Sequence, residues 1–288
     1  MGGGGFVQKN SLWLKKLEAE ISWFENLPKE LWIFTPKFLR GQDCYFTEYL
    51  YNNTLAELFV FGRLPIFIWN KIFYSLKDFL NKLHSFKNEN LILNFDYKTK
   101  TLQRLKEFSK QSSIDLNQKW QLGDKILPSV LELIERLDKY LKNPKSYTLI
   151  HGDFCFSNIM YDFRANNIKT FDPRGMDFDE NISNFGDENY DLAKLVHSVF
   201  GYYDFIIAGF YNIKIKGNVI KFSFSSHNEL QNIQKVFLEI FKPNKEIFAL
   251  NIHLFLSMLP LHKDCKERQI AFLANALRLF CEFFKEEL

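Results

Sequence analysis

Four polar residues between positions 151 and 172 are of the types that phosphoryl-transfer chemistry requires. His151 and Asp153 precede Asn158, which follows the aspartate after four intervening residues, and Asp172 comes later in the chain. An aspartate can accept the proton of an attacking hydroxyl, and an asparagine with a second aspartate can hold magnesium on nucleotide phosphates. The pattern therefore predicts a site in which Asp153 is the base and Asn158 and Asp172 are the metal ligands.

The spacing of these residues is that of the protein-kinase catalytic loop H-R-D-x-x-x-x-N, with Gly152 in place of the arginine. Asp172 follows as the metal-binding aspartate of D-F-G does. Taken singly, each could be a turn former, because Asp and Asn are common in loops for local hydrogen-bonding reasons. Taken together they favour a catalytic site, since independent turn residues have no reason to reproduce the whole constellation.

Short β-prone runs are expected to position this site. They lie at residues 147–150, 158–161 and 168–171. The last two flank a polar turn at residues 162–167, which predicts a hairpin. The two ends of that hairpin would bring Asn158 and Asp172 together.

The N-terminus offers a lysine and a glutamate for the nucleotide phosphates. In the kinase pattern a strand lysine contacts the phosphates and pairs with a helix glutamate. Lys9 precedes a helical segment that carries Glu18 and Glu20, so Lys9 is predicted to pair with Glu20; both could instead be solvated surface charges. The glycines at positions 2–5 could cover phosphates with their backbone amides or be a flexible leader.

At these residues the chain resembles the aminoglycoside phosphotransferase and choline kinase family, whose members carry His-Gly-Asp in place of His-Arg-Asp. Residues 46–50 look like the hinge of that family, residues 79–85 like the end of the helix that follows it, and residues 186–193 like the start of the helix after the metal-binding aspartate. The resemblance covers roughly residues 12 to 200. The sequence Pro173-Arg174-Gly175 after Asp172 departs from the aromatic and acidic residues of most members.

The resemblance implies an α+β, protein-kinase-like fold that binds ATP and Mg²⁺. It implies a reduced N-terminal lobe with the hinge over residues 1–50, and a large helical C-terminal lobe with the catalytic loop over residues 51–288. Backbone groups of Glu48, Tyr49 and Leu50 would contact the adenine. By the same resemblance Asp191 would accept hydrogen bonds from the catalytic-loop backbone, and His151 would support that loop.

Arg174 has two open interpretations. Beside Asp172 it could clamp a phosphate or an acidic substrate bidentately, or it could pair with Asp177 or Asp179. It is therefore the candidate substrate-binding residue.

Periodicity predicts a helix-rich chain around these loops. The expected helices cover residues 12–24, 66–86, 126–142, 187–203, 227–241, 246–259 and 264–285. Short strands are expected at residues 33–38 and 45–50, and a hairpin at residues 211–224 that turns at Gly217-Asn218. The segment after Gly201, which matches no known pattern, is expected to build the acceptor pocket.

Composition narrows the class of protein. The chain has 288 residues, 47% of them hydrophobic, and a net charge of +3, so it can bury a large core and carries no strong field for nucleic acid. Its 4 cysteines form no C-x-x-C pair, which favours the reducing cytoplasm. No apolar run is long enough for a membrane span. The oligomeric state stays open.

Two functions are compatible with these residues. The chain could be an ATP- and Mg²⁺-dependent kinase for a hydroxyl of a small molecule, with a sugar or a precursor of a surface carbohydrate as the acceptor. It could instead be a catalytically silent, kinase-like binding or regulatory module. A base and two metal ligands in one constellation favour the enzyme.

Overall fold

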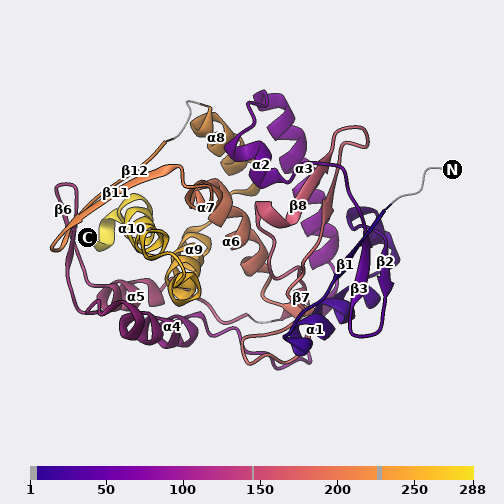
Figure 1. Cartoon of the computed structure of the whole chain (residues 1–288), viewed down its shortest axis with the longest axis horizontal. Helices are drawn as coiled ribbons and strands as arrows, with labels where there is room; N and C mark the ends of the chain where they lie inside the picture. The colour runs from indigo at the N-terminus through magenta and orange to yellow at the C-terminus, as the bar shows by residue number, and fades with distance from the viewer. Residues whose placement is uncertain (1–4, 145, 226–228) are drawn as a thin grey trace. The chain divides into compact units, whose positions relative to one another are not determined.

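The computed structural model describes residues 5–144, 146–225 and 229–288 of the chain (Figure 1). The chain forms two compact units, which are described separately. The first contains Met1–Phe95, Pro144–Leu195 and Lys235–Lys242, and the second contains Asp96–Asn143, Val196–Gln234 and Pro243–Leu288. This division by contacts differs from the predicted lobe boundary at residue 50, which stays a prediction.

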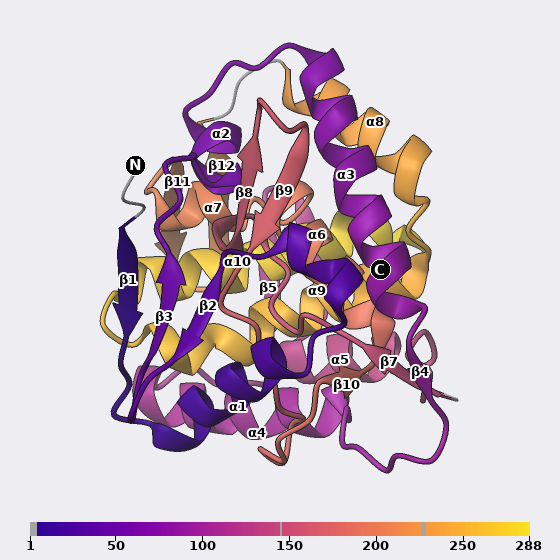
Figure 2. The ribbon, with the colours of Figure 1, turned by 90° about the vertical axis from the view of Figure 1, so that its right-hand side faces the viewer.

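The first unit begins with a three-stranded antiparallel sheet, visible as three neighbouring arrows in Figure 2. Its strands are β1 (Phe6–Lys9), β2 (Phe38–Arg40) and β3 (Tyr45–Glu48), in the order β1-β3-β2. Lys9 is opposite Tyr45 in the register of β1 and β3. The last residue of β1 therefore lies beside the first residue of β3.

The strand predicted at residues 33–38 is wrong. Residues Lys29–Phe34 form the 3-10 helix η1, which buries Leu31 and Phe34, and β2 starts only at Phe38. The spacing of three between the buried residues suits a 3-10 turn, and Pro36 has no amide hydrogen to donate to a strand ladder.

Helix α1 (Leu14–Glu25) follows β1. Its buried residues include Leu17, Ile21 and Phe24, at the helical spacing that predicted it. The helix has no side-chain cap at its start, so tertiary packing of the apolar face holds it in place. Glu20 also lies on the buried side, with 1% of its surface exposed.

The remaining elements of the first unit surround the catalytic loop. They are α2 (Leu55–Val60), α3 (Ile66–His84), β4 (Lys87–Asn88), β7 (Tyr147–Leu149), η2 (Phe156–Asn158), β8 (Ile159–Asp162), β9 (Asn167–Thr170) and β10 (Phe185–Gly186), with most of α6 (Glu188–Val199) and the end of α8 (Leu230–Phe241). Helix α2 begins with a capping box between Thr54 and Glu57, which satisfies two amides that a helix start leaves unpaired.

Aromatic rings fill the core beneath the catalytic loop. Phe154 and Phe156 are fully buried and flank Cys155. The Phe154 ring lies 5.2 Å from Phe79, and the Phe156 ring contacts Phe59 and Trp69 at 5.3 and 5.9 Å. These two phenylalanines anchor the loop to α2 and α3, because moving either would expose a large apolar ring.

The second unit is built from helices and one mixed sheet. Its elements are α4 (Tyr97–Ser112), β5 (Trp120–Leu122), β6 (Lys125–Leu127), α5 (Val130–Asp138), α7 (Tyr203–Ile207), β11 (Tyr211–Lys216), β12 (Val219–Phe224), α9 (Lys245–Met258), η3 (Leu259–His262), α10 (Lys266–Phe283) and η4 (Lys285–Glu287). The sheet order is β11-β12-β5-β6, and α9 packs against α4 and α10.

The elements of the second unit agree with the sequence predictions in part. The hairpin at residues 211–224 and the helices at residues 246–259 and 264–285 are confirmed. The predicted helix at residues 126–142 is wrong in extent, because a strand and a capping box at Ser129 and Glu132 confine α5 to Val130–Asp138. Helix α4 was not predicted, and the start of the helix predicted from residue 227 lies outside the described residues.

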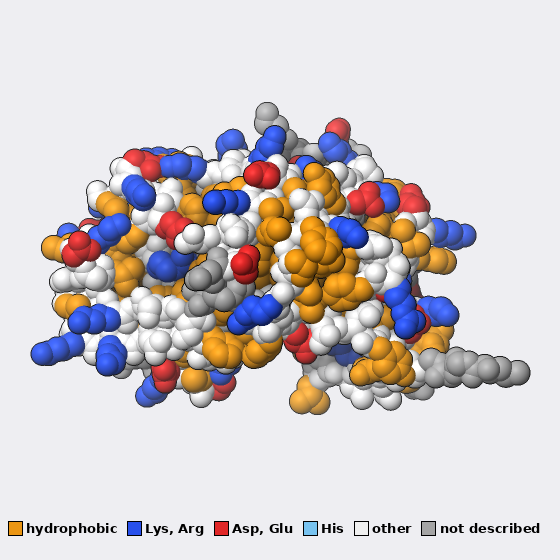
Figure 3. Space-filling model, turned by 90° about the horizontal axis from the view of Figure 1, so that it is seen from above, with side chains coloured by type: hydrophobic (Ala, Val, Ile, Leu, Met, Phe, Trp, Pro, Cys, Tyr) orange, Lys and Arg blue, Asp and Glu red, His pale blue; other side chains and the backbone are white. Residues whose placement is uncertain are grey.

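Charged side chains of both signs are interspersed over the face seen in Figure 3. This agrees with the small net charge of +3 and gives that face no extended field of one sign. Among the helices of the described residues, none combines the length and the apolar content that crossing a membrane requires.

Candidate active site

The side chain of Asp153 is held at both oxygens. Asn158 Nδ2 donates to Asp153 Oδ2 at 3.0 Å and to the Asp153 backbone carbonyl at 2.9 Å. Lys194 Nζ lies 2.9 Å from Asp153 Oδ1. The Asp153 side chain is 40% exposed, so a fixed carboxylate stays accessible to an incoming hydroxyl.

The charges around Asp153 keep it ionised. Burial alone would raise the pKa of Asp153, but the Lys194 ammonium, with a smaller contribution from the Arg174 guanidinium, lowers it from 3.8 to about 2. Burial likewise opposes the charge on Lys194, yet Asp153 raises the pKa of Lys194 well above its ordinary value. The pair is therefore a stable carboxylate and ammonium at neutral pH.

His151 supports the loop through its ring, as the sequence predicted. Its Nδ1 accepts a hydrogen bond from the Asp153 amide at 3.2 Å, so its Nε2 carries the proton and donates to the Phe171 carbonyl at 3.0 Å. Thr170 Oγ1 lies 2.8 Å from the same nitrogen. The ring is completely buried, and burial lowers the pKa of His151. A neutral ring with both nitrogens engaged is a positioning group and not a base.

Side chains of helix α6 contact three consecutive residues of the catalytic loop, 151 to 153. The buried Asp191 carboxylate accepts hydrogen bonds from the amides of His151 and Gly152 at 3.0 and 2.8 Å, and it lies 3.0 Å from His84 Nε2. Three positions further along the helix, Lys194 reaches Asp153. Residues three apart share one face of a helix. The backbone role predicted for Asp191 is thus present in the geometry.

Lys194 was absent from the sequence prediction. Its position in the sequence could have indicated it. Asp191 was predicted to bind the catalytic-loop backbone, and a residue three positions later lies on the same face of the helix. A lysine at that position has an apolar stem and a charged end, so the sequence is equally compatible with a solvent-exposed ammonium. Only the fold shows that its ammonium reaches the candidate base.

Lys9 and Glu20 meet, as predicted. Lys9 Nζ lies 2.9 Å from Glu20 Oε2 and 2.5 Å from Asp172 Oδ1, so one ammonium links two carboxylates. Tyr45 donates its hydroxyl hydrogen to Glu20 Oε2 at 2.8 Å. Burial opposes the charge on Lys9, but Asp172 and Glu20 together raise the pKa of Lys9. Burial, Glu20 and Asp172 also raise the pKa of Tyr45 far above its ordinary value.

The hairpin β8–β9 closes beside the site. Ile159 is opposite Thr170, and the Phe171 amide donates to the Asn158 carbonyl at 3.1 Å. The predicted hairpin is therefore confirmed, and its closing end carries both Asn158 and the residue before Asp172. Asp172 has a φ of +54°, a left-handed conformation in which Asp is enriched among residues other than glycine.

Asn158 and Asp172 each keep an oxygen of the kind that magnesium prefers. Both hydrogens of Asn158 Nδ2 go to Asp153, which leaves its Oδ1 as a hard oxygen donor. Lys9 occupies Oδ1 of Asp172, whose side chain is 43% exposed, which leaves the second carboxylate oxygen. Mg²⁺ binds through one or two protein oxygens together with waters and substrate phosphates. No group of three or more His, Cys, Asp or Glu suited to a metal occurs among the described residues, so phosphates and water would complete such a site.

Arg174 makes neither of its predicted contacts to a carboxylate. Its Nε donates to the Met176 carbonyl at 2.9 Å, a second nitrogen donates to the Asp177 carbonyl at 3.4 Å, and its guanidinium lies 5.3 Å from the Phe178 ring centroid. The Asp177 carboxylate instead accepts hydrogen bonds from Asn181 and Asn94. Arg174 thus supports the loop after Asp172, and its contact with a substrate stays a prediction.

Glycines allow that loop to approach its neighbours. A Cβ on Gly152 would lie 2.6 Å from Arg174 Cβ, and a Cβ on Gly175 would lie 2.2 Å from the Ala19 carbonyl oxygen. Both glycines have positive φ, of +77° and +65°. The first contact explains why a glycine precedes the candidate base here. The second brings the loop directly against the backbone of α1.

Two backbone amides of the predicted hinge already donate hydrogen bonds to residues adjoining the sheet. The Glu48 amide donates to the Lys37 carbonyl at 2.9 Å, and the Tyr49 amide donates to the Gly5 carbonyl at 2.8 Å. These two residues can therefore offer adenine their carbonyl groups and not these amides. The adenine contacts of Glu48, Tyr49 and Leu50 stay a prediction, and Gly2, Gly3 and Gly4 lie outside the described residues.

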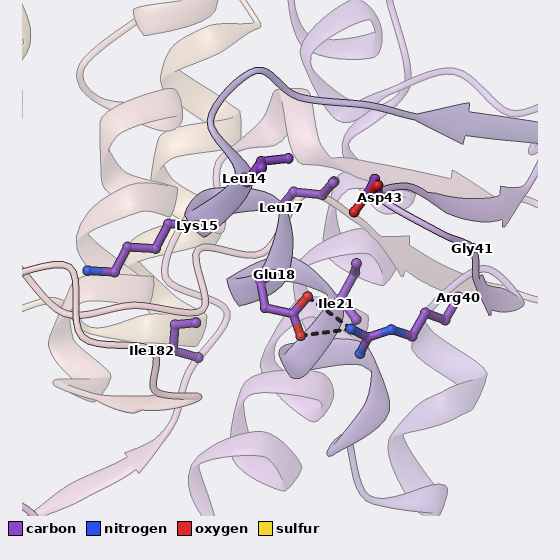
Figure 4. A pocket seen from close by; sticks show the side chains of 9 residues that line it. All are labelled: Leu14, Lys15, Leu17, Glu18, Ile21, Arg40, Gly41, Asp43 and Ile182. Atoms are coloured by element: carbon purple, nitrogen blue, oxygen red, sulfur yellow. Dashed lines mark hydrogen bonds and ion pairs between the residues drawn. The ribbon is translucent and has the colours of Figure 1, made fainter.

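A pocket of about 350 Å³ lies on another face of α1 (Figure 4). Leu14, Leu17 and Ile21 line it together with the ion pair between Arg40 and Glu18, whose closest atoms are 3.0 Å apart. None of the predicted site residues lines this pocket. It is therefore separate from the constellation around Asp153 and Asp172.

Three solved structures of aminoglycoside phosphotransferases are similar to this chain in fold. A thermostable mutant of aminoglycoside phosphotransferase APH(4)-Ia in its apo form is 14% identical, with 96% of this chain and 88% of that chain covered and a TM-score of 0.56. A mutant of aminoglycoside 2'-phosphotransferase-IIIa in complex with GDP is 14% identical, with 100% and 88% covered and a TM-score of 0.55. The gentamicin complex of APH(2")-IIa is 15% identical, with 94% and 84% covered and a TM-score of 0.51.

At these identities the likeness establishes the fold, and it confirms the predicted α+β, protein-kinase-like architecture. No curated protein sequence matches the chain. The model of the phosphotransferase enzyme family matches residues 16–201, which is more than half of the chain and contains Asp153, Asn158, Asp172 and Lys194. The chain therefore belongs to the phosphotransferase enzyme family.

Proposed function

We propose that the protein transfers the γ-phosphoryl group of ATP to a hydroxyl of a small molecule in a reaction that requires Mg²⁺. The observation that carries this proposal is the Lys9 ammonium shared between Glu20 and Asp172, within the same compact unit as the fixed carboxylate of Asp153. A phosphate-binding cation, a metal ligand and a base are the parts that phosphoryl transfer requires. A silent module has no physical need for all three.

Each residue then has a defined task. Asp153 accepts a hydrogen bond from the acceptor hydroxyl and takes its proton as the new bond forms. Its pKa of about 2 makes it a weak base, so it mainly orients the hydroxyl until the proton becomes acidic late in the reaction. Lys9 binds phosphate oxygens, while Glu20 and Tyr45 fix its position.

Asn158 and Asp172 would hold the magnesium ion. When bound, the ion would neutralise part of the charge that develops on the transferring group. The backbone amides of His151 and Gly152, held by Asp191, keep the loop that carries Asp153 in one conformation. Candidate acceptors are a sugar or a precursor of a surface carbohydrate, which offer the hydroxyl that this chemistry consumes.

A thermal-shift and calorimetry series separates this function from a silent module. Mg·ATP should raise the melting temperature of the parent protein, since a ligand that binds only the native state stabilises it. Asp172→Ala should abolish the Mg²⁺-dependent part of ATP binding, whereas Asp78→Ala, on the exposed side of α3, should leave it intact. Equal Mg·ATP affinity in the Asp172→Ala and parent proteins would refute the kinase assignment.

A further inference from the structure

Lys194 is the charged side chain nearest to the candidate base that the reaction scheme above leaves without a chemical task. Its side chain is only 17% exposed, and its ammonium lies 2.9 Å from Asp153 Oδ1. The Tyr190 ring centroid is 5.7 Å from the same nitrogen. An ammonium has three hydrogens, so a single bond to Asp153 leaves donors for another acceptor.

Helix α6 fixes where this ammonium can be. Asp191 attaches the helix to the amides of residues 151 and 152, and Lys194 stands three residues later on the same face. The Lys194 ammonium is therefore placed relative to the loop backbone and does not depend on a flexible surface conformation. A preorganised charge stabilises a transition state most effectively because it needs no reorganisation during the reaction.

The geometry of the reaction brings the transferring phosphoryl group close to this charge. The acceptor oxygen must lie about 2.6–3.2 Å from an oxygen of Asp153 to give up its proton, and about 3–3.5 Å from the γ-phosphorus before attack. The Lys194 ammonium contacts that same carboxylate. Phosphoryl oxygens arriving at this point come within reach of its remaining hydrogens.

We propose that Lys194 is a catalytic residue that donates hydrogen bonds to the transferring phosphoryl group while it holds Asp153 in place. This inference rests on the proposed phosphotransferase function and adds a residue to it. In the step concerned, a bond forms between the acceptor oxygen and the γ-phosphorus as the bond from that phosphorus to the bridging oxygen of ADP breaks. ADP keeps the electron pair, and the hydroxyl proton passes to Asp153 and then to solvent.

The test uses Mg·ADP with tetrafluoroaluminate, a planar anion that imitates the phosphoryl group in transfer, so no acceptor has to be known. Titration calorimetry on the whole protein gives the affinity for Mg·ADP alone and the gain in affinity when tetrafluoroaluminate is added. For Lys194→Met we expect unchanged Mg·ADP affinity and a loss of the tetrafluoroaluminate gain of about tenfold or more, as for a lost transition-state donor. Lys194→Arg should keep most of the gain, because the charge and its donors remain.

Two further variants separate the charge from the fold. Lys194→Gln can still donate to Asp153 but carries no charge, so it should fold and yet lose most of the gain. Lys82→Gln, which removes a lysine from an exposed pair with Asp78, should behave as the parent does. A full tetrafluoroaluminate gain in Lys194→Met or Lys194→Gln overturns the role of Lys194, as does a parent protein that binds Mg·ADP and gains nothing. Failure of the parent to bind Mg·ADP or Mg·ATP at all would instead overturn the proposed function together with this inference.

Discussion

At the scale of single residues, the carboxylates of this chain lie in environments that differ sharply. Asp153 has an ammonium at one oxygen and an amide at the other, and Asp191 is fully buried with backbone donors. Asp204, in α7, is also buried, but its Oδ2 has no hydrogen-bond partner. These differences predict different responses to mutation and pH.

Asp153→Asn should lower turnover by roughly two to four orders of magnitude, the usual contribution of a general base. The affinity for Mg·ATP should change little, because asparagine keeps the size of the side chain and its contact with Asn158. Steady-state kinetics with an identified acceptor, or phosphate release to water, measures the first quantity and calorimetry the second. The exposed Asp78→Asn serves as the control. A variant that keeps the parent rate removes Asp153 from the mechanism.

Asp204 predicts a pH dependence of stability. Burial raises the pKa of Asp204 from 3.8 to about 7, so between these values the native state binds a proton that the unfolded state has lost. The contribution of Asp204 to the free energy of unfolding is therefore fully present below pH 3.8. This contribution is lost as the pH rises to about 7, by up to about 1.4 kcal/mol per pH unit. Asp204→Asn cannot titrate, so its melting temperature relative to the parent should rise from pH 4.5 to 7.5. A constant difference over this pH range for Asp204→Asn would disprove the assignment.

At the scale of elements, α1 and α6 position different parts of the candidate site. Helix α6 contacts the catalytic loop through hydrogen bonds to Asp191 and an ion pair of Lys194. Helix α1 carries Glu20 to Lys9, and the loop after Asp172 packs on its backbone at Ala19. Nucleotide affinity should therefore respond to substitutions that contact no ligand.

Gly175→Ala tests this coupling. The new Cβ would lie 2.2 Å from the Ala19 carbonyl oxygen, so either α1 with Glu20 or the loop with Asp172 must shift, and both movements disturb the contacts of Lys9. We expect a loss of stability of more than about 1 kcal/mol together with weaker Mg·ATP binding. Gly217→Ala is the matched control, because Gly217 has a similar φ of +61° but open space around it. Equal effects of the two variants on Mg·ATP affinity would mean that the backbone conformation matters and the contact with α1 does not.

At the scale of the whole molecule, the sequence predicted local contacts better than it predicted the packing of helices and strands. The hairpin that closes between Asn158 and Asp172 was predicted because it is a local structure, set by short β-prone runs around one polar turn. The roles of Asp153, Asn158 and Asp172 stay predictions. The pair of Lys9 and Glu20 followed from the kinase pattern of a strand lysine and a helix glutamate. Lys194 and Tyr45 were missed because their contacts depend on how α6 and β3 pack, and no local pattern reports packing. Helix α4 was missed since most of its residues are polar, with only a few buried positions such as Leu105 and Phe108 to mark one face.

The division into two units gives a prediction for hydrogen exchange. Every candidate site residue discussed above belongs to the first unit, so Mg·ATP should slow amide exchange mainly in β1, α1 and the catalytic loop. Helices α4, α9 and α10 of the second unit should change much less, because local opening there does not break nucleotide contacts. Exchange followed by mass spectrometry with and without Mg·ATP measures this. Protection confined to the second unit would place the nucleotide elsewhere.

The ammonium of Lys9, shared between Glu20 and Asp172, has a consequence for how ligands enter. Without nucleotide, Lys9 already neutralises part of the charge on Asp172, so the second oxygen of that carboxylate would attract a magnesium ion only weakly. Nucleotide phosphates offer Lys9 a new partner and leave the Asp172 carboxylate to the metal. Metal and nucleotide should therefore assist each other, with a favourable and reciprocal coupling free energy. Each is expected to bind weakly alone, and the two are expected to bind cooperatively as Lys9 moves from Asp172 to the nucleotide phosphates.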